Sequence, residues 1–278
     1  MRLCSEYISG NERSPTLATV ALEMHDVVTV RQQSIAAKRA SWAIFDLDGT
    51  LLRGRDPVSG AVQLLQHFAG RFAIVSNNST HSEVDLSTDL RAAGITVAPD
   101  RLLLAGTMAV ELIARDYSGA RVLLVGNTHL SQIAIGAGLE LVEERADLVL
   151  LARDDRFHYG KLARVANEIL RGALLIATNA DNVHPGEDGQ IVPETGALLR
   201  AVVACATPHH LRIVGKPEPA LLEEAIKRLG VRPADCVMIG DNPETDGAGA
   251  ERCGMPSLLL GRDFVSLDAL ARNIAVGT

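Results

Sequence analysis

Trp42-Ala43-Ile44-Phe45-Asp46-Leu47-Asp48-Gly49-Thr50 is the stretch that decides the fold of this 278-residue chain. Its first four residues are mostly large and apolar, which predicts a buried strand of a parallel sheet. The strand runs into two carboxylates separated by one residue, and then into a glycine that allows a sharp turn. At the carboxyl end of a parallel strand, Asp46 and Asp48 would both reach the crevice where open α/β sheets bind ligands. A simple turn uses the same residue types, so the rest of the chain has to decide between a turn and a site.

The composition is that of a globular protein, with 47% hydrophobic and 22% charged residues. A formal net charge of −7 argues against a nucleic-acid partner or an anionic membrane surface. The sequence has no signal-peptide pattern and no apolar run near 18 residues, so no membrane partner is expected. The four scattered cysteines form no C-x-x-C pair, which favours reduced thiols over a zinc site or disulfides. We therefore predict a cytoplasmic protein.

From Ser41 onward, strand and helix patterns alternate, which is typical of parallel βαβ units. The predicted fold class is α/β, with a Rossmann-like parallel sheet. Pro57 is expected to begin the first helix, because proline is common at the first helical position. Residues 1–40 carry no alternating pattern and predict a loose amino-terminal arm, with one helix near Ala18–Arg39.

Two further strand ends carry residues suited to a phosphate group. Ser76 and Asn77 end one predicted strand just before a helix, where a hydroxyl and free backbone amides can hold a phosphate. The same residues also serve as ordinary helix caps. Lys216 lies between Gly215 and Pro217 after another strand, which makes it a candidate cation for a phosphate oxygen and for the Asp46 carboxylate. A lysine at such a junction is otherwise simply solvated.

A second acidic pair, Asp241 and Asp246, follows the apolar strand 237–239. The alternative for this pair is an acidic helix N-cap. Together with Asp46 and Asp48, these acids would place up to four negative charges in one crevice. Each would repel a phosphate by roughly 4 kcal/mol at a separation of about 4 Å and an effective dielectric constant of about 20. One lysine cannot cancel that repulsion, so we expect a divalent cation, and oxygen ligands with room for waters suit Mg²⁺.

In this order, the Asp46, Ser76, Lys216 and Asp241 segments resemble the four motifs of the haloacid dehalogenase superfamily of phosphohydrolases. The wide spacing between Ser76 and Lys216 is similar to the type with a large α/β cap, the 4-nitrophenyl phosphatase, phosphoglycolate phosphatase, pyridoxal phosphatase and NagD-like group. The resemblance covers about residues 41–261. It implies a core domain of residues 41–106 and 208–278, with a cap domain of residues 107–207 inserted between the two segments.

The resemblance also implies a role for each motif residue. Asp46 would be the nucleophile and Asp48 the general acid and base. Mg²⁺ would be held by Asp46, the backbone carbonyl of Asp48 and Asp241. Ser76, the Asn77 amide and Lys216 would hold the phosphate, and Asp246 would orient Lys216 or a water on the metal.

The polar segment from Asn179 to Pro193 interrupts an apolar block, and loops of this kind often carry function on a rigid scaffold. We predict that Asn179, Asp181 and His184 contact the substrate from the cap. The pair His184-Pro185 resembles a His-Pro of the pyridoxal phosphatase branch, although a solvated loop histidine is the alternative. Glu194 departs from the glycine that is usual in this group.

The activity implied by the resemblance is Mg²⁺-dependent hydrolysis of a small phosphorylated metabolite through an aspartyl-phosphate. Pyridoxal phosphate, phosphoglycolate, glycerol phosphate and a nucleoside monophosphate are the substrates considered. The alternatives are phosphoryl transfer to an acceptor other than water and a non-catalytic module that binds a phosphorylated ligand. A homodimer formed through the cap is a further expectation.

Overall fold

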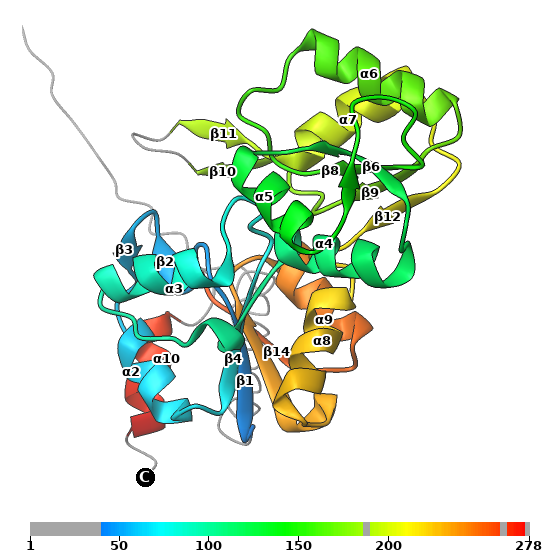
Figure 1. Ribbon diagram of the computed structural model, residues 1–278. Coiled ribbons are helices and arrows are strands. Elements are labelled where there is room, and N and C mark those ends of the chain that lie inside the picture. Colours follow the sequence, from blue (N-terminus) through cyan, green and yellow to red (C-terminus); the bar gives the residue numbers. More distant parts are fainter. Residues whose placement is uncertain (1–39, 186–189, 262–265, 276–278) are drawn as a thin grey trace, which may run out of the picture.

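The computed structural model describes residues 40–185, 190–261 and 266–275. It contains two five-stranded sheets, one above the other, each flanked by helices (Figure 1). The predicted helix near Ala18–Arg39 lies outside the described residues.

The first sheet, which we call the core sheet, has the strand order β14-β13-β1-β4-β5, and all of its strands are parallel. Its strands are β1 (Trp42–Asp46), β4 (Phe72–Ser76), β5 (Leu102–Leu104), β13 (Cys236–Gly240) and β14 (Ser257–Leu259). The central strand β1 therefore lies between β4 and β13, although β13 comes much later in the chain.

Both faces of the core sheet are covered, because alternate side chains of each strand point to opposite sides. Ala43 and Phe45 join one apolar cluster, whereas Ile44 joins another. The first cluster is completed by α2 (Ala61–Phe68), α3 (Glu83–Ala92) and α10 (Leu267–Ala275). The opposite face is covered by α4 (Ala105–Asp116), α8 (Ala220–Leu229) and α9 (Ala248–Arg252).

The second sheet, which we call the cap sheet, has the order β12-β9-β8-β6-β7 and is also parallel throughout. Its strands are β6 (Arg121–Val125), β7 (Glu140–Leu141), β8 (Leu148–Leu151), β9 (Leu174–Ala177) and β12 (Leu211–Ile213). The helices of this part are α5 (Thr128–Gly136), α6 (Tyr159–Leu170) and α7 (Thr195–Cys205). The predicted α/β class, with a Rossmann-like parallel core, is confirmed.

The cap sheet extends beyond the predicted end of the cap at residue 207. Leu211 of β12 pairs with Leu175 of β9, so residues 211–213 belong to the cap sheet and not to the core. The chain adds this edge strand before it returns to the core, a step that a short, half-polar segment does not reveal in sequence. The other domain limits stay a prediction.

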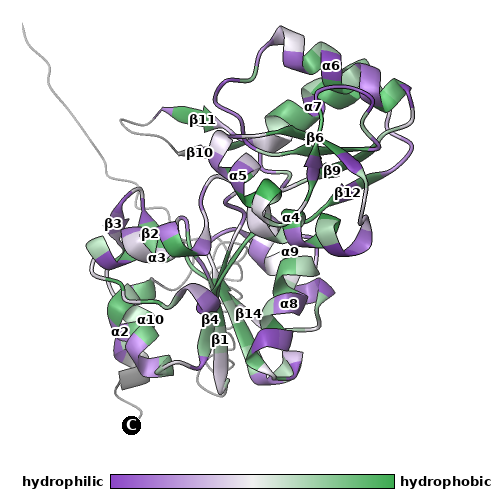
Figure 2. Cartoon of the chain, in the orientation of Figure 1, coloured by the Kyte–Doolittle hydropathy of each residue, from purple (hydrophilic) through white to green (hydrophobic). Residues whose placement is uncertain are grey.

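One apolar cluster connects the two sheets. It contains Ile44 and Val75 of the core sheet together with Leu148 and Ile176 of the cap sheet, and α4 contributes Ala109, Leu112 and Ile113. Figure 1 shows α4 between the two sheets, and Figure 2 shows their strands coloured mainly as hydrophobic. The core and the cap therefore share a continuous interior.

Two antiparallel hairpins lie outside the sheets. The first joins β2 (Leu52–Arg53) to β3 (Asp56–Pro57), and the second joins β10 (Val183–Pro185) to β11 (Ile191–Pro193). Pro57 therefore ends a strand, and the next helix begins only at Ala61, after Gly60 with φ of 90°. The prediction for Pro57 was wrong because the fixed φ of proline suits an edge strand as well as a helix start. Among the described helices, none combines the length and the hydropathy needed to cross a membrane.

Candidate active site

Two aspartates and a serine of the core meet at one edge of the core sheet. Asp46 is the last residue of β1, Ser76 is the last residue of β4, and Asp241 directly follows β13. Because β4 and β13 flank β1, their carboxyl ends bring these three side chains together, at the edge where parallel sheets bind ligands.

Lys216 is buried at the centre of this group. Its Nζ donates to Asp46 Oδ1 at 2.5 Å and to Asp246 Oδ1 at 2.7 Å. The other oxygen of Asp246 accepts hydrogen bonds from the backbone amides of Asp241 and Asn242, at 3.2 and 3.1 Å. Both oxygens of Asp246 are thus engaged by the protein, which fixes Lys216 against Asp46.

Asp48 has a different environment, because its side chain is exposed to the crevice. Its Oδ2 accepts a hydrogen bond from Ser76 Oγ at 3.2 Å, and Ser76 Oγ in turn accepts one from the amide of Asn78 at 3.1 Å. The first acid of the pair is therefore buried beside a lysine, whereas the second can reach a ligand and water.

Gly49 allows Asp241 to approach this pair. Its φ is 90°, a left-handed conformation that favours glycine, and a Cβ at this position would overlap Asp241 Oδ2. Thr50 Oγ1 donates to the other oxygen of Asp241 at 3.4 Å. Gly49 and Thr50 thus help to position Asp241, which follows a different strand.

The charges of the site do not balance. Burial raises the pKa of Asp46 to about 8, and the charges of Asp246 and Asp48 add to the increase against the opposing effect of Lys216. Burial alone would lower the pKa of Lys216, but the charges of Asp246 and Asp46 outweigh it and raise that pKa. Lys216 contacts both Asp46 and Asp246, and the raised pKa of Asp46 indicates that this lysine does not offset the carboxylates around it.

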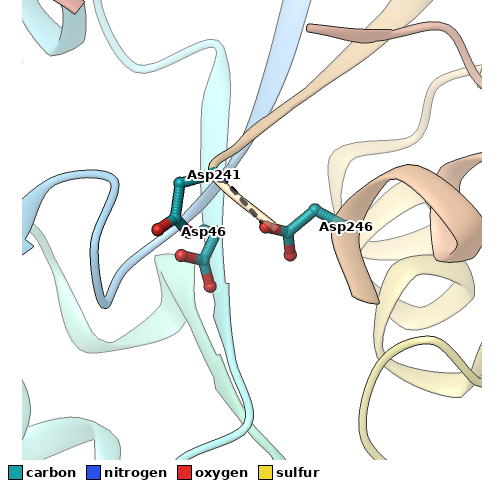
Figure 3. Close-up of side chains that lie close together, drawn as sticks. All are labelled: Asp46, Asp241 and Asp246. Atoms are coloured by element: carbon teal, nitrogen blue, oxygen red, sulfur yellow. Dashed lines mark hydrogen bonds between the residues drawn. The ribbon is translucent and has the colours of Figure 1, made fainter. Parts of the chain in front are cut away.

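The donor set fits a hard divalent cation. Asp46, Asp241 and Asp246 each offer a carboxylate oxygen, and these atoms lie within 4.8 Å of one another (Figure 3). Because Asp246 is already occupied by Lys216 and two backbone amides, Asp46 and Asp241 are the carboxylates with free capacity. All-oxygen ligands with an open side match the preference of Mg²⁺.

These residues open into a cavity of about 630 Å³ between the core and the cap. Nine of the ten predicted site residues line it: Asp46, Asp48, Ser76, Asn77, Asp181, His184, Lys216, Asp241 and Asp246. Asn179 does not line it. Its fully buried side chain donates to the carbonyl of Asn77 at 2.8 Å and to Thr195 Oγ1 at 3.3 Å. The predicted substrate contact of Asn179 is corrected to a contact between cap and core, because its side chain points at the loop after β4.

Asn77 has a second function that the sequence does not indicate. Its side chain accepts from the amide of Lys216 at 2.8 Å and donates to the carbonyl of Lys216 at 3.0 Å. It also donates to Asp181 Oδ2 at 2.8 Å. Asn77 thereby ties the backbone of Lys216 to the core and to the cap.

Sequence reasoning missed Arg153, and it recorded Glu194 only as a departure from the usual glycine. Arg153 follows β8, and its amide donates to Ser79 Oγ at 3.2 Å. Glu194 Oε1 accepts from Arg153 Nη1 at 3.2 Å and contacts His184 Nδ1 at 2.7 Å. Burial raises the pKa of the Glu194 carboxyl, against the lowering effects of Arg153 and His184. Arg153 could have been predicted, because it is a polar residue just after the apolar strand β8, and polar residues at strand ends were the signal that predicted the core site.

Comparison with known proteins identifies the family. The model of the haloacid dehalogenase-like hydrolases matches residues 41–254, which is most of the chain. The chain belongs to this family of hydrolases.

The chain is also similar to individual proteins in sequence and in structure. D-glycerol 3-phosphate phosphatase of Mycobacterium tuberculosis (strain ATCC 25618 / H37Rv) is 36% identical over 221 residues, which cover 78% of this chain and 62% of that protein. The chain thus matches less than two thirds of the length of this relative. The structure of glycerol phosphate phosphatase from Mycobacterium tuberculosis in complex with magnesium has a TM-score of 0.73 at 34% identity, covering 81% of this chain and 69% of that one. The structure of p-nitrophenyl phosphatase from Archaeoglobus fulgidus has a TM-score of 0.76 at 27% identity, and the match covers 84% of this chain and 99% of that one.

Proposed function

We propose that this protein is a Mg²⁺-dependent phosphomonoester hydrolase that acts on a small phosphorylated metabolite. The observation that carries the proposal is the contrast between the two acids of one loop. Asp46 is buried against Lys216, whereas Asp48 is exposed to the cavity and bonded to Ser76. Phosphoryl transfer through an enzyme carboxylate needs one acid as nucleophile and another that exchanges protons with the leaving group and with water.

In the first step, an oxygen of Asp46 attacks phosphorus and forms an aspartyl-phosphate, and the bond from phosphorus to the alcohol oxygen breaks. Asp48, in its protonated form, gives its proton to the departing alcohol. In the second step, Asp48 takes a proton from water as the water oxygen attacks phosphorus, and the bond from phosphorus to the Asp46 oxygen breaks. Inorganic phosphate leaves, and Asp46 and Asp48 return to their starting states.

The remaining residues hold the phosphate and its charge. Ser76 and Lys216 lie where they can donate to phosphate oxygens, together with the amide of Asn77. Asp46, Asp241 and the backbone carbonyl of Asp48 would hold Mg²⁺, which neutralises charge on the transferring group when bound. Asp246 keeps Lys216 in place.

The names of the relatives support a small phosphorylated metabolite as substrate, and the magnesium complex of one of them supports the choice of metal. Their activities belong to those proteins, and this chain covers only part of the first. Transfer to an acceptor other than water and phospho-ligand binding without turnover are the two competing proposals.

The test is hydrolysis of 4-nitrophenyl phosphate by the purified protein in the presence of Mg²⁺. We expect release of nitrophenol and phosphate in equal amounts, and loss of both after addition of EDTA. Nitrophenol released in excess over phosphate when glycerol is added would favour phosphoryl transfer to an alcohol. Folded protein that binds phosphate but releases no nitrophenol would favour the binding module.

A homodimer through the cap and a cytoplasmic location are proposals that rest on the sequence. The exposed Tyr159 and Leu170 of α6, at 85% and 70%, are apolar surface that such a cap contact would cover. Sedimentation of the wild-type protein and of Tyr159→Ser with Leu170→Ser would test the dimer.

A further inference from the structure

Three side chains on the cap face of the cavity are not used by the phosphoryl-transfer steps. Arg153 lies after β8, His184 lies on β10, and Glu194 directly follows β11. Together with Val183, they line the same cavity as Asp46 and Lys216. They therefore face the part of a bound phosphomonoester that lies beyond its phosphate.

These side chains form one connected group. Glu194 Oε1 lies 2.7 Å from His184 Nδ1 and accepts from Arg153 Nη1 at 3.2 Å. Backbone hydrogen bonds fix two of the three positions, because the amide of Arg153 donates to Ser79 Oγ and the amide of Glu194 donates to the carbonyl of Asn182. Ser79 belongs to the loop that follows Ser76, so the group has a defined position relative to the phosphate site.

The group has both donors and acceptors to spare. A guanidinium has five N–H donors and an ionised carboxylate has about four acceptor positions. Arg153 uses one donor on Glu194, and Glu194 uses its Oε1 for Arg153 and His184. A hydroxyl placed here can accept from Arg153 and donate to Glu194 at the same time.

The pairing changes what Arg153 can recognise. An arginine alone in a cavity binds a carboxylate through two parallel hydrogen bonds. Here Glu194 accepts one hydrogen bond from Arg153 Nη1, and its negative charge beside the guanidinium would repel a second carboxylate. Among the described residues that line the cavity, none is Phe, Tyr or Trp, so an aromatic leaving group finds no ring of that kind to stack on.

We propose that Arg153, His184 and Glu194 form a leaving-group subsite that selects phosphate esters of neutral polyhydroxy alcohols, such as glycerol, over esters with an acidic leaving group. This inference rests on the proposed phosphatase activity. It assigns Glu194 as the residue that excludes the acidic substrate.

The experiment compares kcat/KM for glycerol 3-phosphate with kcat/KM for phosphoglycolate and takes their ratio. The ratio does not depend on the fraction of active enzyme, so a variant that merely folds poorly leaves it unchanged. We expect the wild type to prefer glycerol 3-phosphate and Glu194→Gln to lower the ratio at least 10-fold, mainly through a gain on phosphoglycolate. Adding Arg153→Met to Glu194→Gln should remove that gain, because Arg153 is the group that the substitution frees. Arg156→Met, an exposed arginine of the same loop that does not line the cavity, is the matched control.

Hydrolysis of 4-nitrophenyl phosphate by the wild type distinguishes a failure of the proposed phosphatase activity from a failure of the proposed subsite. No hydrolysis of any of the three esters would reject the phosphatase itself. Hydrolysis of 4-nitrophenyl phosphate, with phosphoglycolate preferred over glycerol 3-phosphate or with neither accepted, would overturn the subsite. An unchanged ratio in Glu194→Gln, with both substrates reduced together, would also overturn it.

Discussion

The core sheet and the cap sheet have the same architecture but carry different chemistry at their edges. Each has five parallel strands, and the residues that follow three cap strands meet the loop after β4 of the core. Asn127, Arg153 and Asn179, which follow β6, β8 and β9, bond to Thr80, Ser79 and Asn77 respectively. The two carboxyl edges thus lie on opposite sides of one cavity.

The difference lies in the residue types at these edges. The carboxyl edge of the core sheet carries Asp46, Asp48, Asp241 and Asp246. The residues that follow the cap strands are mainly amides, together with the acid Asp181, Arg153 paired with Glu194, and Lys216, which follows β12 and reaches the core acids. The cap does contain a fully buried acid, Glu168 of α6, but its carboxylate accepts from the amides of Arg145 and Ala146 inside the fold. A parallel sheet therefore provides the position of a site, and the side chains at its edge decide whether that position is reactive.

The largest expected effect tests the reactive edge directly. Asp46→Asn removes the proposed nucleophile and should lower kcat for 4-nitrophenyl phosphate by on the order of 10⁴ or more. Asp155→Asn changes an exposed acid in the loop after β8 of the cap and should leave kcat within about 2-fold. Steady-state kinetics of the two variants would contradict the comparison if Asp46→Asn kept a tenth of the wild-type rate.

The second effect concerns the approach of Asp241 to the reactive edge. In Gly49→Ala, the new Cβ overlaps Asp241 Oδ2, and such a displacement near 1 Å costs about 10²-fold in kcat/KM. The Mg²⁺ concentration at half-maximal rate should rise as well. Gly70→Ala carries a similar left-handed strain, with φ of 81°, but a Cβ there meets no atom within 4 Å. Equal losses in the two variants would attribute the effect to backbone strain alone.

The third effect concerns Asn77, which connects the core sheet edge to the cap. Asn77→Asp keeps the acceptor for the Lys216 amide but loses the donors to the Lys216 carbonyl and to Asp181, and it places two carboxylates together. With two hydrogen bonds lost at about 1 kcal/mol each, we expect kcat/KM to fall about 10- to 100-fold. Asn127→Asp keeps its helix cap and loses one bond to the core, so its activity should change only a few-fold. A fall in kcat/KM for Asn127→Asp as large as that for Asn77→Asp would mean that the activity depends on contacts between cap and core in general, and not on the hydrogen bonds to the Lys216 backbone.

The smallest effect on activity is expected for the buried acid of the cap. Glu168→Gln cannot satisfy both amides and Arg171, so the free energy of unfolding should fall by about 1–3 kcal/mol while kcat stays unchanged. Burial alone would raise the pKa of Glu168, but hydrogen bonds from Arg171, Arg145 and Ala146 hold that pKa below its usual value. A lowered folded pKa gives stability that is present above the unfolded pKa, near 4.3, and is lost as pH falls through the folded pKa.

Chemical unfolding at neutral pH and near pH 3 would measure this dependence. The difference between Glu168→Gln and the wild type should be present at neutral pH and shrink in acid. Glu143→Gln, whose exposed carboxylate pairs with Arg164, should change stability by no more than about 0.5 kcal/mol. A difference that grows in acid would reverse the sign of our assignment.

Much of the core site could be predicted from the sequence because Asp46 and Ser76 end apolar strands and Asp241 directly follows one. Asp46, Ser76 and Asp241 could be placed from strand ends alone, and the structure brings them together with Lys216. The role of Gly49 was only half visible, since a turn was expected but the approach of Asp241 depends on a strand from the far end of the chain. Pairing between distant strands is not encoded in local patterns.

The cap was harder to predict for physical reasons. The segment 211–213 is short and half-polar, so nothing local distinguishes a cap edge strand from a core strand. Asn179 lies just beyond the end of a strand and Ser76 ends one, yet the Asn179 side chain turns toward the core loop and not into the cavity. Arg153 is one of many arginines in the sequence, and only its contact with Glu194 sets it apart.

The pairing of β1 with β13 also means that the core sheet cannot be completed until late in synthesis. Thr50 and Asp241 lie 191 residues apart, and Asp46 and Lys216 lie 170 residues apart. At about 5–20 residues per second, the ribosome needs roughly 10–40 s to supply β13 after β1. During that time one edge of β1 has no partner, and open strand edges promote aggregation. No core strand lies between β6 and β12 in the chain, so the inserted part can fold early and bring the two halves of the core together. We expect the reactive carboxylates to be assembled last, from an early strand and a late one.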